Sequence, residues 1–114
     1  MSGATGMDEQ QKLNDAKAQM LATKATLDDP TYIAGLTQDQ QDDAIVKSAS
    51  LSTAIEKIEN TQIAVIADKV SANSAELQKA TADLAAANAQ IQNATALLNA
   101  AGSLLSIVGR IVAL

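Results

Sequence analysis

Residues 63–112 read IAVIADKVSANSAELQKATADLAAANAQIQNATALLNAAGSLLSIVGRIV, and a seven-residue repeat runs through the whole stretch. Every seventh residue from Ile63 is a large aliphatic, and the column three residues later consists mostly of alanine. Large and small apolar residues that alternate in this a/d pattern are typical of a helix that lies along other helices. The repeat therefore predicts an all-α fold.

The helix that carries the repeat is expected to be very long. Between Thr37 and Gly102 the sequence contains neither Gly nor Pro, and the register of the repeat continues through residues 71–76. We therefore favour one continuous coiled-coil helix over residues 38–96 above a break near 71–76 that would give a three-helix bundle. Extended to Ala100, such a helix would be about 95 Å long at about 1.5 Å per residue.

Two local features of the sequence bear on this interpretation. Thr37 and Gln40 have the spacing of a capping box, which places a helix start directly after Thr37. The apolar phase slips by one residue between Ile58 and Ile63, and we interpret the slip as a local change of supercoil without a break.

The segments before the long helix are expected to form its partner. Residues 1–7 are predicted to be a flexible tail, residues 8–28 a first helix with the same large and small pattern, and residues 29–37 a proline-containing turn. Asp29 is placed to cap a short helical turn over residues 30–34. The first helix would then fold back along the beginning of the long helix as an antiparallel hairpin.

The rest of the apolar seam would lie bare in a monomer, so it predicts a homo-oligomer. The residues expected to make this self-association are Ile63, Ile66, Val70, Leu77, Ala80, Leu84, Ala87, Ile91, Ala94, Leu98 and Ala101.

The apolar face widens in residues 97–114, which form a strongly amphipathic segment with Asn99, Gly102, Ser103 and Ser106 on the opposite side. Three partners for this segment stay open: neighbouring helices of an oligomer, a membrane that it lies on or enters, and a groove of a different protein. The expected membrane or assembly contacts are Leu97, Leu104, Leu105, Val108, Arg110, Ile111 and Val112.

The composition argues against catalysis and against nucleic-acid binding. The chain has no Cys and no His, so zinc sites, thiolate nucleophiles and Ser-His-Asp chemistry lack their essential groups. A net charge of −5 and a single aromatic residue, Tyr32, do not suit phosphate tracking or base stacking. We expect no enzyme activity, no cofactor, no metal, no nucleic-acid partner and no small-molecule substrate.

In composition the chain resembles exported bacterial filament subunits such as flagellin ends and secretion-needle proteins, which are long helices or helical hairpins poor in Cys and Trp. The resemblance covers no defined motif and assigns no residue. The leading interpretation is a non-enzymatic, self-assembling structural subunit. The alternatives are a membrane-active or pore-forming protein that inserts residues 97–114, and a small helical adaptor or chaperone.

The polar N-terminus lacks the pattern of a cleaved signal peptide. This leaves a cytoplasmic location or export by another route, with an extracellular or membrane-associated location open.

Overall fold

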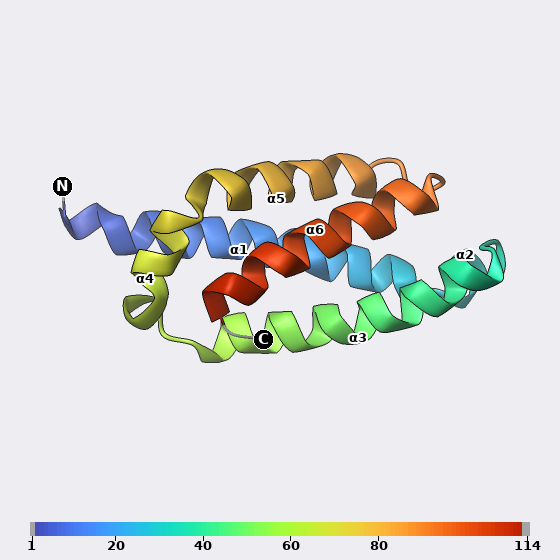
Figure 1. The fold of residues 1–114 in the computed structure, drawn as a ribbon, viewed down its shortest axis with the longest axis horizontal. Helices are drawn as coiled ribbons and strands as arrows, with labels where there is room; N and C mark the ends of the chain where they lie inside the picture. Colours follow the sequence, from blue (N-terminus) through green and yellow to red (C-terminus); the bar gives the residue numbers. More distant parts are fainter. Residues whose placement is uncertain (1, 113–114) are drawn as a thin grey trace.

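Four long helices form a bundle in the computed structural model, which describes residues 2–112 and, for residues 2–7, the backbone alone (Figure 1). The long helices are α1 (Ser2–Leu27), α3 (Gln38–Asn60), α5 (Ser74–Asn88) and α6 (Ala94–Val112), and the short ones are α2 (Pro30–Ala34) and α4 (Ile63–Ala72). The described residues contain no strand, which confirms the all-α prediction.

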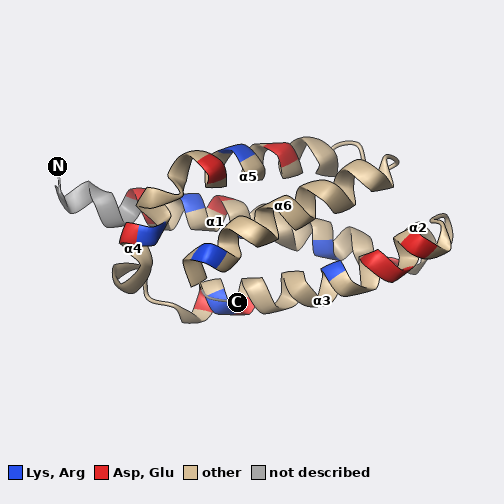
Figure 2. Ribbon diagram, in the orientation of Figure 1, with Lys and Arg blue, Asp and Glu red and all other residues tan. Residues whose placement is uncertain are grey.

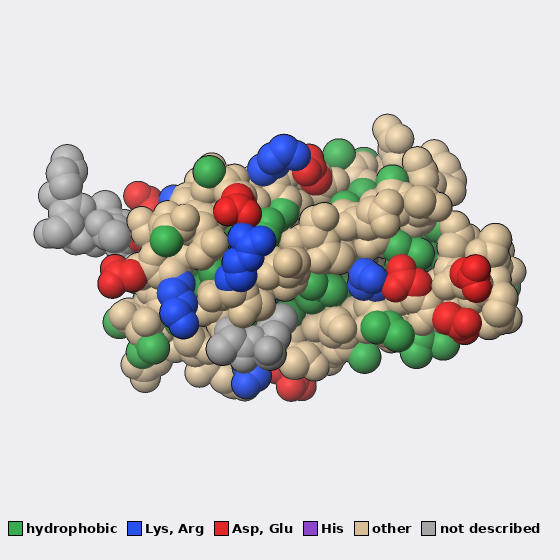
Figure 3. All heavy atoms as spheres, viewed as in Figure 1, with side chains coloured by type: hydrophobic (Ala, Val, Ile, Leu, Met, Phe, Trp, Pro, Cys, Tyr) green, Lys and Arg blue, Asp and Glu red, His purple; other side chains and the backbone are tan. Residues whose placement is uncertain are grey.

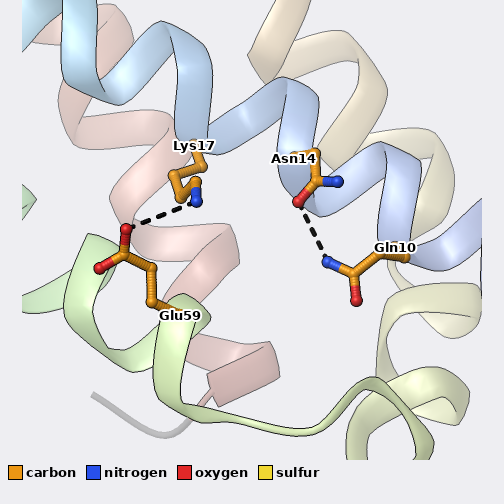
Figure 4. A network of polar contacts seen from close by, with 4 residues as sticks. All are labelled: Gln10, Asn14, Lys17 and Glu59. Carbon is orange, nitrogen blue, oxygen red and sulfur yellow. Dashed lines mark hydrogen bonds and ion pairs between the residues drawn. The ribbon is translucent and has the colours of Figure 1, made fainter.

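The long helices form a ring in the order α1, α3, α6, α5 (Figure 1). As the sequence predicts for the hairpin, α1 runs antiparallel to α3: Asp28 contacts Ser48 near one end of the pair, and Lys17 Nζ lies 3.5 Å from Glu59 Oε2 further along. Figure 4 shows this ion pair beside a hydrogen bond within α1, between Gln10 and Asn14.

The order of the long helices around the bundle differs from their order in the chain. The next long helix after α3 is α5, which lies diagonally opposite α3. The short helix α4 makes this diagonal connection across one end of the bundle, where it contacts α1, α5 and α6. The opposite end is formed by α2 and the connection from α5 to α6 (Figure 1).

The continuous helix predicted over residues 38–96 is wrong, since the chain leaves the helix at residues 61–62, at Asn73 and at residues 89–93. The longest dimension of the molecule is 49 Å, about half of what the predicted helix would require. A coiled coil is therefore not what this repeat builds within the chain.

The first break lies where the apolar phase slips. Thr61 and Gln62 are extended, with φ/ψ of −99°/129° and −73°/131°. The Thr61 hydroxyl donates to the backbone carbonyl of Lys57 at 2.6 Å, which pairs one of the carbonyls left free at a helix end. The slip between Ile58 and Ile63 thus marks the end of a helix instead of a change in supercoil.

The second break is the one-residue interruption at Asn73, inside the stretch 71–76 where the sequence left a break open. Its φ/ψ of −105°/13° lies outside the helical range, and its side-chain amide donates to the Lys69 carbonyl at 2.8 Å. The Asn73 side chain makes no capping hydrogen bond to α5.

The third break is the loop of residues 89–93, which reverses the chain between α5 and α6. Asn93 Oδ1 accepts a hydrogen bond from the backbone N–H of Ala96 at 3.1 Å, at the start of α6. The Tyr32 hydroxyl in α2 donates to the carbonyl of Ile91 and so connects this loop to α2. The seven-residue spacing of large aliphatics continues through the sequence of this loop, although Ile91 lies in the loop and not in a helix.

The predicted helix starts at α2 and α3 are confirmed. The Asp29 carboxylate accepts from the backbone N–H of Thr31 at 3.0 Å and caps α2. Thr37 and Gln40 make both hydrogen bonds of the predicted capping box at the start of α3.

The predicted limits of the first and last segments need correction. Helix α1 begins at Ser2, before the predicted start at Asp8, and so includes residues 2–7, while the flexibility predicted for this segment stays a prediction. The glycines in this segment lower helix propensity but, unlike proline, leave the hydrogen-bond ladder intact. At the other terminus, residues 113–114 of the predicted segment 97–114 lie outside the described residues.

The buried face of α1 includes two polar residues with different surroundings. Thr23 is fully buried, and its hydroxyl lies 2.9 Å from Asn88 Oδ1 and 3.0 Å from the Gln19 carbonyl. Asn88 in turn donates to Gln19, so this cluster joins α1 to α5 through satisfied hydrogen bonds. Glu9 is 4% exposed, and its Oε2 has no hydrogen-bond partner among the described residues.

We predict that Glu9→Met stabilises the fold. A buried polar atom without a partner costs about 1–3 kcal/mol, and methionine has a similar shape without that cost. Urea denaturation should show a free energy of unfolding higher by about 1 kcal/mol or more. Glu56→Met, at an exposed position of α3, is the matched control and should change it by less than about 0.5 kcal/mol. A loss of stability in Glu9→Met would contradict this account.

We predict that Tyr32→Phe destabilises the α2 end of the bundle and changes its response to alkali. Burial raises the pKa of Tyr32 above its ordinary value of 10.0, and only the neutral hydroxyl can donate to Ile91. Because the folded-state pKa is the higher one, this contribution to stability is complete below pH 10 and is lost as pH rises through the folded-state value.

Urea denaturation at neutral pH should show Tyr32→Phe less stable by about 0.5–1.5 kcal/mol. Measured at pH values on both sides of 10, the difference between the two proteins should shrink as the tyrosine ionises. A constant difference across that range would contradict the role of the neutral hydroxyl.

Candidate interaction surface along helix α6

Helix α6 has one buried apolar face and one outward face of small and polar residues. The apolar face packs against α1, α3, α4 and α5. The exposed positions of the outward face recur every three or four residues and include Thr95, Asn99, Ser103, Ser106 and Arg110.

The structure places most residues predicted for membrane or assembly contact in the interior. Leu105 is partly buried, and Arg110 is exposed. The buried ones are Leu97, Leu104, Val108, Ile111 and Val112. Their apolar surface is covered by other helices of the same chain.

The residues predicted for self-association are also mainly in the core. Ile63 is partly buried, and Ile91 is exposed in the loop of residues 89–93. The buried ones are Ile66, Val70, Leu77, Ala80, Leu84, Ala87, Ala94, Leu98 and Ala101. The expectation that this seam lies bare in a monomer is wrong, because the helix breaks fold its segments against one another and against α1 and α3.

A shallow groove of about 570 Å³ follows the outward face of α6. Lys47 of α3 and Glu76 of α5 contribute to its walls, and α6 contributes Leu98, Asn99, Gly102, Ser103, Ser106, Ile107 and Arg110. Figure 3 shows this face, on which a band of polar and backbone atoms lies over α6 between the neighbouring helices.

Two basic side chains lie where neighbouring helices meet α6 in the groove. Arg110 Nη1 lies 2.8 Å from Glu76 Oε2 and ties α6 to α5. Lys47 crosses α6 at Gly102, where an added Cβ would stand 3.1 Å from the lysine Cε, and its Nζ lies 2.8 Å from Asp43. The glycine therefore allows α3 and α6 to come together around the lysine side chain.

The outward face of α6 is distinct because it carries no charge before Arg110 (Figure 2). The other long helices have ion pairs on or beside their outer faces: Lys24–Asp28 lies at the C-terminal end of α1, Lys47–Asp43 on α3 and Lys79–Asp83 on α5. Bundle helices normally present charged residues to water. The uncharged strip of α6 is therefore a candidate contact surface.

The chemistry of the groove suits contact more than reaction. Its one carboxylate, Glu76, is already paired with Arg110. Among the described residues, no group of three His, Cys, Asp or Glu side chains is placed to hold a metal ion. The sequence pattern identified the polar side of α6, but Lys47 and Glu76 carried no signal because only the tertiary fold brings them to it.

Comparison of the chain with protein-family models, with curated proteins and with solved structures found no match. No relative therefore assigns a role to the residues of the groove.

We predict a small coupling energy between Arg110 and Glu76. Both side chains are about half exposed, at 53% and 57%, and exposed ion pairs contribute about 0.2–1 kcal/mol. A double-mutant cycle with Arg110→Ala and Glu76→Ala, read by urea denaturation, should give this value and should lose most of it at high salt. A coupling above about 2 kcal/mol would show that the pair holds α6 much more firmly than its exposure indicates.

Proposed function

We propose that the protein is a non-enzymatic helical bundle that acts at membranes, with α6 as the segment that enters the lipid. One observation carries this proposal: α6 is the one helix among the described residues that is long and apolar enough to cross a bilayer. Its 19 residues span about 28 Å at about 1.5 Å per residue, close to the thickness of a hydrocarbon core of about 30 Å.

The outward face of α6 supports the proposal further. The buried share of α6 is 44%, and its exposed residues before Arg110 are Thr95, Ala96, Asn99, Ser103 and Ser106, none of which is charged. Small residues on one face also allow helices to approach closely in lipid, so several α6 helices could associate there through this face.

The arrangement of the bundle suits a stored membrane segment. In water, the large aliphatic side chains of α6 are covered by α1, α3, α4 and α5. Only a few polar contacts tie the helix to its neighbours, among them Gln40–Thr95 at 3.2 Å near one end and Arg110–Glu76 near the other. Transfer into lipid would keep the aliphatic side chains out of water, since lipid tails are as apolar as the core.

A self-assembling structural subunit is the second candidate, favoured by the groove along α6. A second copy could lie on this small-residue surface without burying an unpaired charge, because Lys47, Glu76 and Arg110 in its walls are already in ion pairs. Sedimentation without lipid tests it: large species whose amount rises with concentration would favour the subunit, and a monomer at all concentrations would remove it. The adaptor or chaperone stays a prediction from the sequence.

We predict that the protein releases dye from phosphatidylcholine–phosphatidylglycerol vesicles and that Ser103→Asp suppresses the release. Ser103 is exposed and lies midway along α6, so the bundle should tolerate the substitution. At the centre of a membrane helix, Asp costs about 2.5–3.5 kcal/mol, which corresponds to a roughly hundredfold loss in insertion.

Ala82→Asp on α5 is the matched control, because it places the same charge at another exposed small residue and should leave release unchanged. Circular dichroism should show both variants folded. An inert wild-type protein, or equal release from both variants, would refute insertion of α6.

A further inference from the structure

We propose that the side chain of Lys47 is a strap that retains α6 in the bundle, and that α6 must displace it before it enters lipid. This inference rests on the proposed function and specifies what restrains the segment that would insert. It follows from the way in which α3 and α6 run beside each other, from the contact of Lys47 with Gly102 and from the ion pair that fixes the lysine.

Helices α3 and α6 lie side by side and run in the same direction (Figure 1). Gln40 contacts Thr95 at 3.2 Å near the start of both helices, and Lys47 contacts α6 at Gly102. Both chains advance by seven residues between these two contacts, so the helices are in step. Lys47 is therefore placed where α3 faces α6, close to the midpoint of the 19 residues of α6.

The end of the Lys47 side chain lies directly on the backbone of α6. A Cβ added at Gly102 would stand 3.1 Å from the lysine Cε and 3.8 Å from its Nζ. The Lys47 side chain is 21% exposed, the lowest value among the lysine and arginine side chains that form ion pairs in the described part of the chain. Its apolar stem thus packs on the helix instead of extending into water.

The surface is open on both sides of this contact. A hollow of about 200 Å³ between α3 and α6 lies on one side, with Asp43 and Asn99 among its lining residues. On the other side, the groove of about 570 Å³ follows α6 to Arg110. Among the described residues, Lys47 is the one from α3 that lines this groove. It is therefore the point at which α3 reaches over the outward face of α6.

The carboxylate of Asp43 fixes the strap. Lys47 Nζ lies 2.8 Å from Asp43 Oδ1, one turn earlier on α3, so the lysine is attached to α3 at both ends and crosses α6 between them. Such a partly exposed ion pair is weak and is screened by salt. Because the side chain is also flexible, the strap can open without any unfolding of α3.

A contact on the outward face is well placed to restrain α6. Lipid tails are as apolar as the core, so the aliphatic face of the helix offers little resistance to a transfer into lipid. The contacts to Thr95 and Arg110 act near the two ends of α6, whereas Lys47 acts at its middle. Loss of this one side chain should therefore ease the departure of the helix.

The first test is hydrogen exchange of the folded protein in water, followed by mass spectrometry. Lys47→Ala should speed the exchange of the α6 amides about fivefold and leave α1 unchanged. Asp43→Asn keeps the lysine stem but frees its end, and should speed α6 exchange about twofold.

Two control variants should leave α6 exchange at the wild-type rate. Lys79→Ala breaks an ion pair of the same spacing on α5. Asp42→Asn removes the same charge one position from Asp43, at a carboxylate that accepts a hydrogen bond from Gln38. The second test is dye release from phosphatidylcholine–phosphatidylglycerol vesicles, in which Lys47→Ala and Asp43→Asn should be faster by the same factors and the controls should not.

Unchanged α6 exchange in Lys47→Ala, or an equal rise in all four long helices, would overturn the strap, because Lys47 would then at most stabilise the bundle as a whole. Faster α6 exchange without faster dye release would overturn its role in limiting insertion. A wild-type protein that releases no dye would refute the insertion of α6, and the exchange data would still decide whether Lys47 retains the helix in water.

Discussion

The burial of the apolar face of α6 is the interaction on which the rest of the structure depends. The chain contains no Phe and no Trp, so its core must be assembled from aliphatic side chains and alanine. A fully buried Leu, Ile or Val contributes about 1.5–3 kcal/mol, whereas the methyl group of alanine contributes much less. Helix α6 supplies the densest set of large aliphatics and contacts four other helices. The Ala-rich seams of the other helices become a core because α6 covers them.

This dependence also limits how the protein could act on a membrane. A segment apolar enough to hold the bundle together is apolar enough for lipid. The same side chains could therefore pack in the bundle in water or face lipid in a bilayer. The difference between the states lies in packing and in the polar groups: Asn99 and Arg110 face water in the bundle and would need partners in a bilayer. Their placement on the small-residue face means that neighbouring α6 helices could supply those partners. If α6 enters lipid as proposed, joint insertion of several α6 helices would therefore be more favourable than insertion of one.

The sequence indicates which faces are buried but not what covers them. The helix starts at Asp29 and Thr37 were predictable because the hydrogen bonds that define them join residues two or three positions apart. The loop of residues 89–93 was not, since part of what holds it is Tyr32, 59 positions from Ile91. A heptad repeat looks the same whether its partner is another chain or a later segment of its own. Likewise, the pattern identified the polar side of α6, while Lys47 and Glu76 reach it only through the ring of helices.

The ring order gives α4 a position that neither its length nor its composition explains. Because α3 and α5 are diagonal partners, the connection between them must cross the end of the bundle, where no further described helix covers its outer side. The inner residues Ile66 and Val70 complete the core, and the outer residue Val65 stays in water. A polar residue there would keep the same fold, since only the inner face of α4 is needed for packing. The valine is therefore a feature that the stability of the bundle does not require.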